Sequence, residues 1–222
     1  MVSIKLKMNI SNPLHLQTFN TALDLGSGDS TFAKKLHIKN MYLIDKSFKK
    51  ISKNPMKMDS HSLCINAEAE SLPFKSYSID IVLCKKVLHH LKSLKNVKDE
   101  ILRILKNKGY FFLIDITVDD EDAYYNCASY LRNKDHIRYY RVNEILDFFK
   151  EDFRLILYYY NKEEIFFSEW LKNCDKNVKT EIESSFSNMP FKIKRAIEFK
   201  IQRNNCLSFF RKEGYFLFQR VK

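Results

Sequence analysis

The first half of the chain alternates short apolar runs with amphipathic stretches. Five runs have the length and composition of buried strands: Thr21–Leu25, Met41–Ile44, Leu63–Ile65, Ile79–Cys84 and Tyr110–Ile116. Apolar residues recur at helical spacing over Ser30–His37 and Val97–Leu105, and Asn107-Lys108-Gly109 has the form of a glycine C-cap for the second helix. Strands and helices in alternation predict crossover connections, and therefore a mostly parallel sheet with helices on both faces.

The pattern changes after Asp115. An aromatic and polar stretch, residues 123–140, precedes an expected helix over Val142–Phe149 and an expected strand over Phe153–Tyr160. Ile165–Met189 and Phe191–Gln202 are expected to be helical, and Tyr215–Val221 to form the last strand. The chain is thus predicted to be an α/β protein with seven strands and a helical insertion before the last of them. No low-complexity linker divides it, so we expect a single domain.

Composition and charge narrow the class of protein. The chain has 222 residues, 45% of them hydrophobic, which is enough for a substantial core. Its formal net charge is +11, and residues 34–57 hold eight lysines against one acid. A second basic cluster consists of Lys192, Lys194, Arg195, Lys200 and Arg203. This balance favours anionic partners such as nucleic acid or phosphorylated substrates, with a solubilising surface as the plainer interpretation.

The cysteines and the apolar runs indicate the cellular compartment in which we expect the protein. The five cysteines are scattered and lack CxxC spacing: Cys64, Cys84, Cys127, Cys174 and Cys206. They support neither a disulfide framework nor a zinc site, so we expect a reduced, cytoplasmic protein without a metal. No apolar run approaches the roughly 20 residues that a membrane span needs. The N-terminal segment lacks the apolar centre of a signal peptide.

The candidate chemistry starts with a glycine pair in the sequence ALDLGSGDS, residues 22–30. Gly26-Ser27-Gly28 follows an apolar strand, where glycines let the backbone turn sharply and a ligand approach closely. In sheets of this kind ligands bind at the carboxyl ends of the strands. Asp45 ends the next expected strand and can accept bonds from both hydroxyls of a ribose. The segment AEAESLPF, residues 67–74, places acids in a loop after the third strand, where an acid can accept a bond from an exocyclic amine.

Five segments in this order carry a resemblance: LDLGSGD, YLIDKS, AEAESLPFKSYSIDIV, KVLHHL and ILRILKNKGYFFLID. As a set they resemble the class I S-adenosylmethionine (SAM)-dependent methyltransferases of the methyltransferase-11 group, which includes the quinone-biosynthesis enzymes. The resemblance covers Leu23 to Asp115 and implies a Rossmann-like fold. It implies a core over residues 20–117, a substrate or lid region over 118–213 and a last strand over 214–222. More loosely, SYLRNKDHIRYY and FFSEWL are similar to an uncharacterised bacterial branch of the group.

The resemblance implies that ten residues bind SAM. Six are expected around its methionine part and sulfonium: Asp24, Gly26, Ser27, Gly28, Cys84 and Lys85. Asp45 is expected to hold the ribose with Lys46 beside it, and Glu68 and the backbone of Ala69 to meet the adenine. Ser30 stands where the group often has a third glycine, and a serine can still cap the helix that follows.

The methyl acceptor is predicted less specifically. Methyl transfer needs alignment above all, and a base only where the acceptor is an un-ionised hydroxyl or an acidic carbon. His136 is the first candidate for that base, with Arg132 and Arg138 able to attract an anionic group. The alternative for His136 is a surface histidine in a polar lid. His89 and His90 are more typical of local packing or capping.

Three functions therefore remain open. The first is methyl transfer to a small-molecule acceptor, anionic or aromatic in character. The second is methylation of tRNA or another RNA, which the net charge and the LHH segment favour. The third is a SAM-binding module without catalysis.

Overall fold

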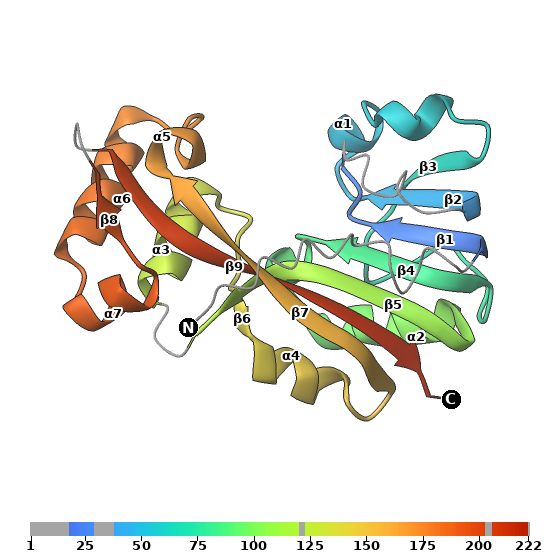
Figure 1. Ribbon diagram of the computed structural model, residues 1–222. Coiled ribbons are helices and arrows are strands. Elements are labelled where there is room, and N and C mark those ends of the chain that lie inside the picture. Colours follow the sequence, from blue (N-terminus) through green and yellow to red (C-terminus); the bar gives the residue numbers. More distant parts are fainter. Residues whose placement is uncertain (1–17, 29–37, 120–122, 203–205, 222) are drawn as a thin grey trace. The chain divides into compact units, whose positions relative to one another are not determined.

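The computed structural model describes residues 18–28, 38–119, 123–202 and 206–221 (Figure 1). The helix expected over Ser30–His37, with Ser30 itself, lies outside these residues. The chain divides into two compact units. The first unit contains the described residues of Met1–Lys85, Lys95–Phe112 and Gln219–Lys222. The second contains those of Lys86–Leu94 and Leu113–Phe218.

The first unit is built mainly on the strands of the N-terminal half. They are β1 (Phe19–Leu25), β2 (Ile38–Asp45), β3 (Ser62–Asn66), β4 (Ile79–Lys85) and the first part of β5 (Leu105–Val118). Short helices α1 (Phe48–Ile51) and η2 (Pro55–Met58) follow β2, and α2 (Leu94–Ile104) precedes β5. β1 pairs in parallel with β2 and with β4, and β2 in parallel with β3. The expected parallel order of the first half is confirmed.

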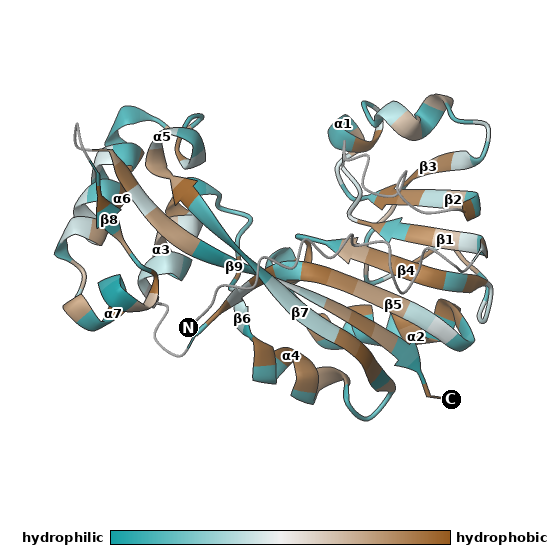
Figure 2. Ribbon diagram, in the orientation of Figure 1, coloured by the Kyte–Doolittle hydropathy of each residue, from teal (hydrophilic) through white to brown (hydrophobic). Residues whose placement is uncertain are grey.

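The second unit holds the rest of β5 and the C-terminal elements. In chain order they are η3 (Leu88–His90), α3 (Ala123–Arg132), β6 (Tyr140–Arg141), α4 (Val142–Phe149), β7 (Phe153–Phe166), α5 (Phe167–Trp170), α6 (Lys176–Asn188), α7 (Phe191–Ala196), β8 (Lys200–Ile201) and β9 (Leu207–Arg220). Helix α4 has the bounds that its apolar spacing predicts. It buries Ile145 and Phe149 while Asp147 is exposed, so brown and teal segments alternate along it in Figure 2.

The strand order is β3-β2-β1-β4-β5-β9-β7, with β6 paired to β5 and β8 paired to β9. Seven strands lie on the main path, as expected, and the structure adds the two-residue strands β6 and β8 for a total of nine. β8 runs antiparallel to β9. Helices cover both sides of the sheet, and α5, α6 and α7 precede the last strand, as the sequence predicts. Among the described residues no helix is long and apolar enough to cross a membrane.

The C-cap predicted at Gly109 is wrong. Helix α2 ends at Ile104, and Gly109 lies inside β5. Lys108 has the left-handed φ of 59°, whereas Gly109 does not. A Cβ on Gly109 would stand 2.8 Å from the Lys106 carbonyl oxygen and 3.1 Å from that of Asp80. The glycine is therefore needed for close backbone approach and not for ending the helix.

The long helix predicted over Ile165–Met189 is also partly wrong. β7 continues to Phe166, and two separate helices, α5 and α6, follow it. Beyond the predicted end at Tyr160, side chains join β7 to β9: Arg211 donates to Glu163 (2.8 Å), and Ser208 Oγ donates to Glu164 Oε1 (2.9 Å). Similarly, α7 ends at Ala196 where a helix to Gln202 was expected, and the last strand begins at Leu207, earlier than predicted.

Candidate functional site

The carboxyl ends of three parallel strands meet in the first unit. Leu25, the last residue of β1, is in register with Ile44 of β2 and with Cys84 of β4. β1 lies between β2 and β4. The chain therefore adds β2 and β3 on one side of β1 and then β4 and β5 on the other side, so the direction in which strands are added reverses at β1. Such a switch point is where open α/β sheets bind ligands. The glycine loop, Asp45 and Lys85 all lie at this end of the strands.

The glycine loop is held by two side chains that clamp the backbone of Gly28. The Gly28 N–H donates to Asp45 Oδ2 (2.9 Å), and the Gly28 carbonyl accepts from Asn54 Nδ2 (2.8 Å). Both loop glycines have positive φ, 67° at Gly26 and 52° at Gly28. A residue with a Cβ would be strained in this region, so the glycine pair is explained by the turn itself. We call these contacts of Gly28 the Gly28 clamp.

Asn54 was not singled out from the sequence. It is completely buried, and its Oδ1 also accepts from the Met56 N–H (2.9 Å). The signal for it is the Asn54-Pro55 pair, which favours a turn and ends the lysine-rich stretch. Asp45 Oδ1 accepts from the Ser47 N–H (2.8 Å), so each carboxylate oxygen of Asp45 uses one lone pair within the protein.

Two buried polar atoms beside the loop have no hydrogen-bond partner within the described residues: Asp24 Oδ2 and Ser27 Oγ. Asp24 is 2% exposed and Ser27 is 3% exposed. Burial raises the pKa of Asp24 to about 7, with Lys85 opposing and Asp45 adding to the shift. Buried polar atoms are seldom left unpaired, and those that are call for an explanation such as a ligand. The glycine loop therefore has polar atoms that a ligand can pair.

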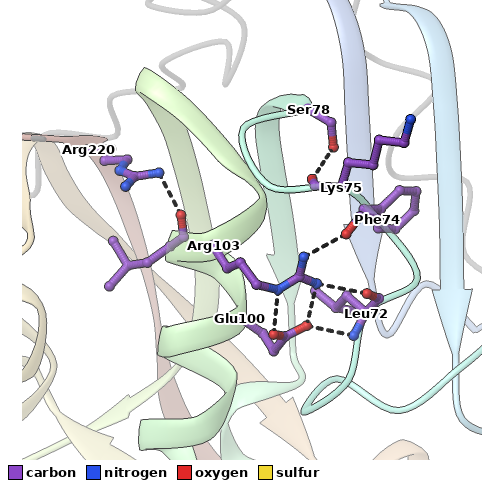
Figure 3. A network of polar contacts seen from close by, with 8 residues as sticks. Leu72, Phe74, Lys75, Ser78, Glu100, Arg103 and Arg220 are labelled. Carbon is purple, nitrogen blue, oxygen red and sulfur yellow. Dashed lines mark hydrogen bonds and ion pairs between the residues drawn. The ribbon is translucent and has the colours of Figure 1, made fainter.

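The loop that carries Glu68 and Ala69 directly follows β3 and is anchored to α2. Figure 3 shows Arg103 donating to the carbonyls of Leu72 (2.9 Å) and Phe74 (2.6 Å), while Glu100 accepts from the Leu72 N–H (2.7 Å). Hydrogen bonds from Arg103 lower the pKa of Glu100, although burial opposes the shift. The side chains of Glu68 and Lys46 are exposed. The anchored loop thus presents the Glu68 carboxylate to solvent.

The second unit gathers three histidines. The rings of His89 and His90 lie 4.1 Å apart, those of His89 and His136 lie 5.5 Å apart, and the Tyr139 ring lies 4.4 Å from that of His136. His89 Nδ1 donates to Asp115 Oδ1 (2.5 Å), and Asp115 is 1% exposed. This histidine–aspartate pair, which the sequence analysis did not identify, joins η3 to β5.

His136 is 4% exposed, so the surface interpretation of this histidine is wrong. Its Nε2 donates to Asn126 Oδ1 (3.0 Å), and the same oxygen accepts from the Tyr139 N–H (2.7 Å). Burial, followed by the neighbouring His89 and His90, lowers the pKa of His136 to about 4. His136 is therefore neutral near physiological pH with its lone pair on Nδ1, the form that a general base requires.

The two arginines expected to attract an anion are already engaged. Arg132 Nε donates to the Trp170 carbonyl (2.9 Å), and Arg138 pairs with Glu144. Burial raises the pKa of Glu144, but the hydrogen bonds from Arg138 and Arg141 outweigh it and bring this pKa to about 2. Within the described residues no group of three or more His, Cys, Asp or Glu side chains is arranged to hold a metal ion.

Comparison with known proteins agrees with this geometry. The strand order and the glycine loop are those of a Rossmann-like fold. Residues 23–113 match the methyltransferase domain family Methyltransf_11. The crystal structures of BH2331 from Bacillus halodurans and YcgJ from Bacillus subtilis share the fold. Their TM-scores are 0.84 and 0.83 and their identities 19% and 20%, and each match covers 91% of this chain and 93% and 92% of theirs.

Two curated relatives match over shorter segments. YcgJ, named an uncharacterized methyltransferase, is 36% identical over 73 residues, which are 32% of this chain and 29% of that protein. The arginine-hydroxylase NDUFAF5 of Danio rerio is 33% identical over 98 residues, which are 43% of this chain and 30% of that protein. The segments that match in sequence thus span less than a third of the length of each of these relatives.

The raised pKa of Asp24 gives a testable pH dependence. The folded protein keeps this proton up to about pH 7, whereas the unfolded chain releases it near 3.8, so ionisation disfavours folding as the pH rises between these values. We expect Asp24→Asn to remove this penalty. Its free energy of unfolding relative to wild type should increase across this window by up to about 4 kcal/mol.

Urea unfolding at a series of pH values measures the difference. The matched control is Asp99→Asn, because Asp99 is half-exposed and pairs only with Lys95 in the described contacts. A difference between Asp24→Asn and wild type that stays constant with pH would show that Asp24 is ionised in the folded protein.

Proposed function

We propose that this protein is an enzyme that binds SAM and transfers its methyl group to a small-molecule acceptor. The observation that carries the proposal is the Gly28 clamp, which ties a glycine loop after β1 to the carboxylate that ends β2. The match of residues 23–113 to a methyltransferase domain supports it. So do solved structures of the same fold, which include a phosphoethanolamine N-methyltransferase of Haemonchus contortus in complex with SAM.

The residues of the first unit fit the cofactor. Asp45 retains lone pairs on both carboxylate oxygens after bonding Gly28 and Ser47, as two ribose hydroxyls require. The unpaired Asp24 Oδ2 and Ser27 Oγ suit a polar methionine group. We assign the ribose to Asp45 with Lys46, and the adenine to Glu68 and Ala69.

The methionine part and the sulfonium are assigned to the remaining residues of the first unit: Asp24, Gly26, Ser27, Gly28, Cys84 and Lys85. Cys84 is buried and in register with Leu25, so the end of β4 adjoins the glycine loop. Lys85 acts on Asp24 electrostatically and supplies a positive charge beside it.

Methyl transfer from SAM requires little of the protein except alignment of the reacting groups. SAM supplies an activated methyl group, and displacement at that carbon needs the nucleophile in line with the leaving sulfur. Where the acceptor must lose a proton, His136 is our first candidate for the base, because its Nε2 is committed to Asn126 and its Nδ1 keeps a lone pair. His89, oriented by Asp115, is the second. One of these two histidines supplies the base, and the ring of the other lies 5.5 Å from it.

Asp45→Asn is expected to weaken SAM binding by at least about tenfold, because charge-assisted hydrogen bonds to the ribose are lost. Isothermal titration with SAM and S-adenosylhomocysteine measures both affinities. Asp59→Asn is the matched control, since Asp59 is an exposed acid that accepts a local backbone bond. Thermal unfolding checks that each variant is folded. An Asp45→Asn affinity equal to wild type contradicts the ribose assignment, and no binding by folded wild type contradicts the proposal.

The base is tested by the pH dependence of turnover. With His136 as the base, formation of S-adenosylhomocysteine in a small-molecule extract should be flat near neutral pH and fall as the pH approaches about 4, where His136 gains a proton. His136→Gln should lower turnover by about a hundredfold or more with SAM affinity unchanged. His89→Gln is the comparison, and a larger loss in that variant would transfer the role to His89.

RNA methylation is the second candidate, favoured by the net charge of +11 and by the lysines around α1. Lys46, Lys49, Lys50 and Lys53 are exposed there. If RNA is the substrate, the affinity for tRNA measured by filter binding should fall by at least about tenfold between about 50 and 200 mM salt. Replacing Lys49, Lys50 and Lys53 by Gln should reduce it, whereas the same change at exposed Lys150, Lys172 and Lys176 should not. Salt-independent or absent tRNA binding leaves the small-molecule function.

A further inference from the structure

The loop between β3 and β4 is held at both of its ends. At its start, Asn66 donates from Nδ2 to the carbonyls of Asp45 (2.8 Å) and Lys46 (2.9 Å). The turn that follows is closed by a hydrogen bond from the Ser71 N–H to the Glu68 carbonyl, which at 3.3 Å is longer than usual. The anchors on either side of this turn therefore decide where the Glu68 backbone lies.

The second anchor is the Glu100–Arg103 pair of α2 (Figure 3). Arg103 Nη2 donates to the Leu72 carbonyl and Nη1 to the Phe74 carbonyl, while Glu100 Oε2 accepts from the Leu72 N–H. Arg103 also donates from Nε to Glu100 Oε1 (2.7 Å) and from Nη2 to Glu100 Oε2 (2.8 Å). Bidentate arginine–carboxylate pairs of this kind are strong and geometrically specific. The pair that holds the loop is thus itself fixed in position.

The two anchored residues of the loop also pack against the unit. Leu72 is buried, and the Phe74 ring lies 4.9 Å from that of Tyr42 on β2. Leu72 directly follows Ser71, so the peptide that Glu100 and Arg103 hold adjoins the turn that carries Glu68. A displacement of this anchor is therefore passed on to Glu68.

A second ion pair on the same helix gives a comparison. Lys95 and Asp99 form an i,i+4 pair whose side chains are 77% and 51% exposed. The Arg103 and Glu100 side chains are only 35% and 18% exposed, and they contact the loop as well as each other. Exposed pairs contribute little to stability or to position. The Glu100–Arg103 pair has the burial and the partners of a device that fixes the loop.

We propose that Arg103 and Glu100 are positioning residues that make the cofactor site selective for adenine, by fixing the turn from which Glu68 accepts a hydrogen bond from the 6-amino group. The inference rests on the proposed function, which assigns the adenine to Glu68 and Ala69. The Glu68 side chain is exposed, so packing does little to orient it and the backbone beneath it must be held. A site built to hydrogen-bond an amine discriminates against a ligand that lacks it.

The selectivity for the base measures this role directly. Isothermal titration compares S-adenosylhomocysteine with its purine analogue, which lacks only the 6-amino group. Wild type is expected to bind S-adenosylhomocysteine about tenfold more tightly, because the analogue loses a hydrogen bond to a charged acceptor. Glu68→Ala should bring this ratio of affinities close to one. Arg103→Gln should lower the ratio by at least about threefold, because Glu68 is then no longer held in place.

A double-mutant cycle separates positioning from a general effect on folding. With Glu68→Ala in place, Arg103→Gln should not change the ratio further, because both substitutions act on one hydrogen bond. Arg103→Lys should give an intermediate ratio, since a lysine keeps the charge but lacks the fork that holds two carbonyls. Lys95→Gln, which breaks the exposed pair of the same helix, is the matched control and should keep the wild-type ratio. Thermal unfolding confirms that each sample is folded, and a loss of stability alone does not alter the ratio.

Three results would overturn the inference. They are a wild-type ratio near one, a wild-type ratio retained by both Arg103 variants, and a further change of the ratio when Arg103→Gln is added to Glu68→Ala. In each case S-adenosylhomocysteine still binds, so the proposed function stands. Folded wild type that does not bind S-adenosylhomocysteine contradicts the proposed function itself, and the inference with it.

Discussion

The candidate site of the first unit depends on how the peptide of Gly28 is held. Asp45 accepts from its N–H and Asn54 donates to its carbonyl, so the loop after β1 is tied to the end of β2 and to the turn before η2. Both loop glycines have a positive φ that other residues adopt only with strain. Within the part of the chain that the structure describes, each Asp45 oxygen keeps its second lone pair. One carboxylate thus both shapes the loop and remains able to bind a ligand.

Two buried polar atoms beside the glycine loop, Asp24 Oδ2 and Ser27 Oγ, have no hydrogen-bond partner within the described residues. Each such atom costs about 1 to 3 kcal/mol of stability relative to a paired one. Proteins retain costs of this kind where function requires them. The position of these two atoms beside the glycine loop is what a hydrogen-bonding ligand would explain.

The central strands β1 and β4 were predictable because they are mostly buried on both faces, whereas the residues of the edge strand β3 are exposed or half-buried. Continuous apolar runs mark such strands, and β1, β3 and β4 differ from the predicted spans by no more than two residues at either end. Asp45 was predictable for the same reason, since it terminates such a run. Gly109 misled the prediction because a glycine after a helix suggests a cap, whereas the Asp80 carbonyl across the sheet decides its role.

The sequence by itself determined the strand pattern, the glycine turn and the resemblance of residues 23–113 to a methyltransferase domain, because these depend on local periodicity and on motifs within short segments. Only the tertiary structure decided which distant side chains meet. His89 bonds Asp115, His136 packs beside both, and Tyr125 and Arg211 line one cavity although 86 positions separate them in the chain. The hydrogen-bond partners of Arg132 and Arg138 could likewise not be predicted from the sequence. The sequence gives the charge of each side chain, but the fold decides which residues lie next to it.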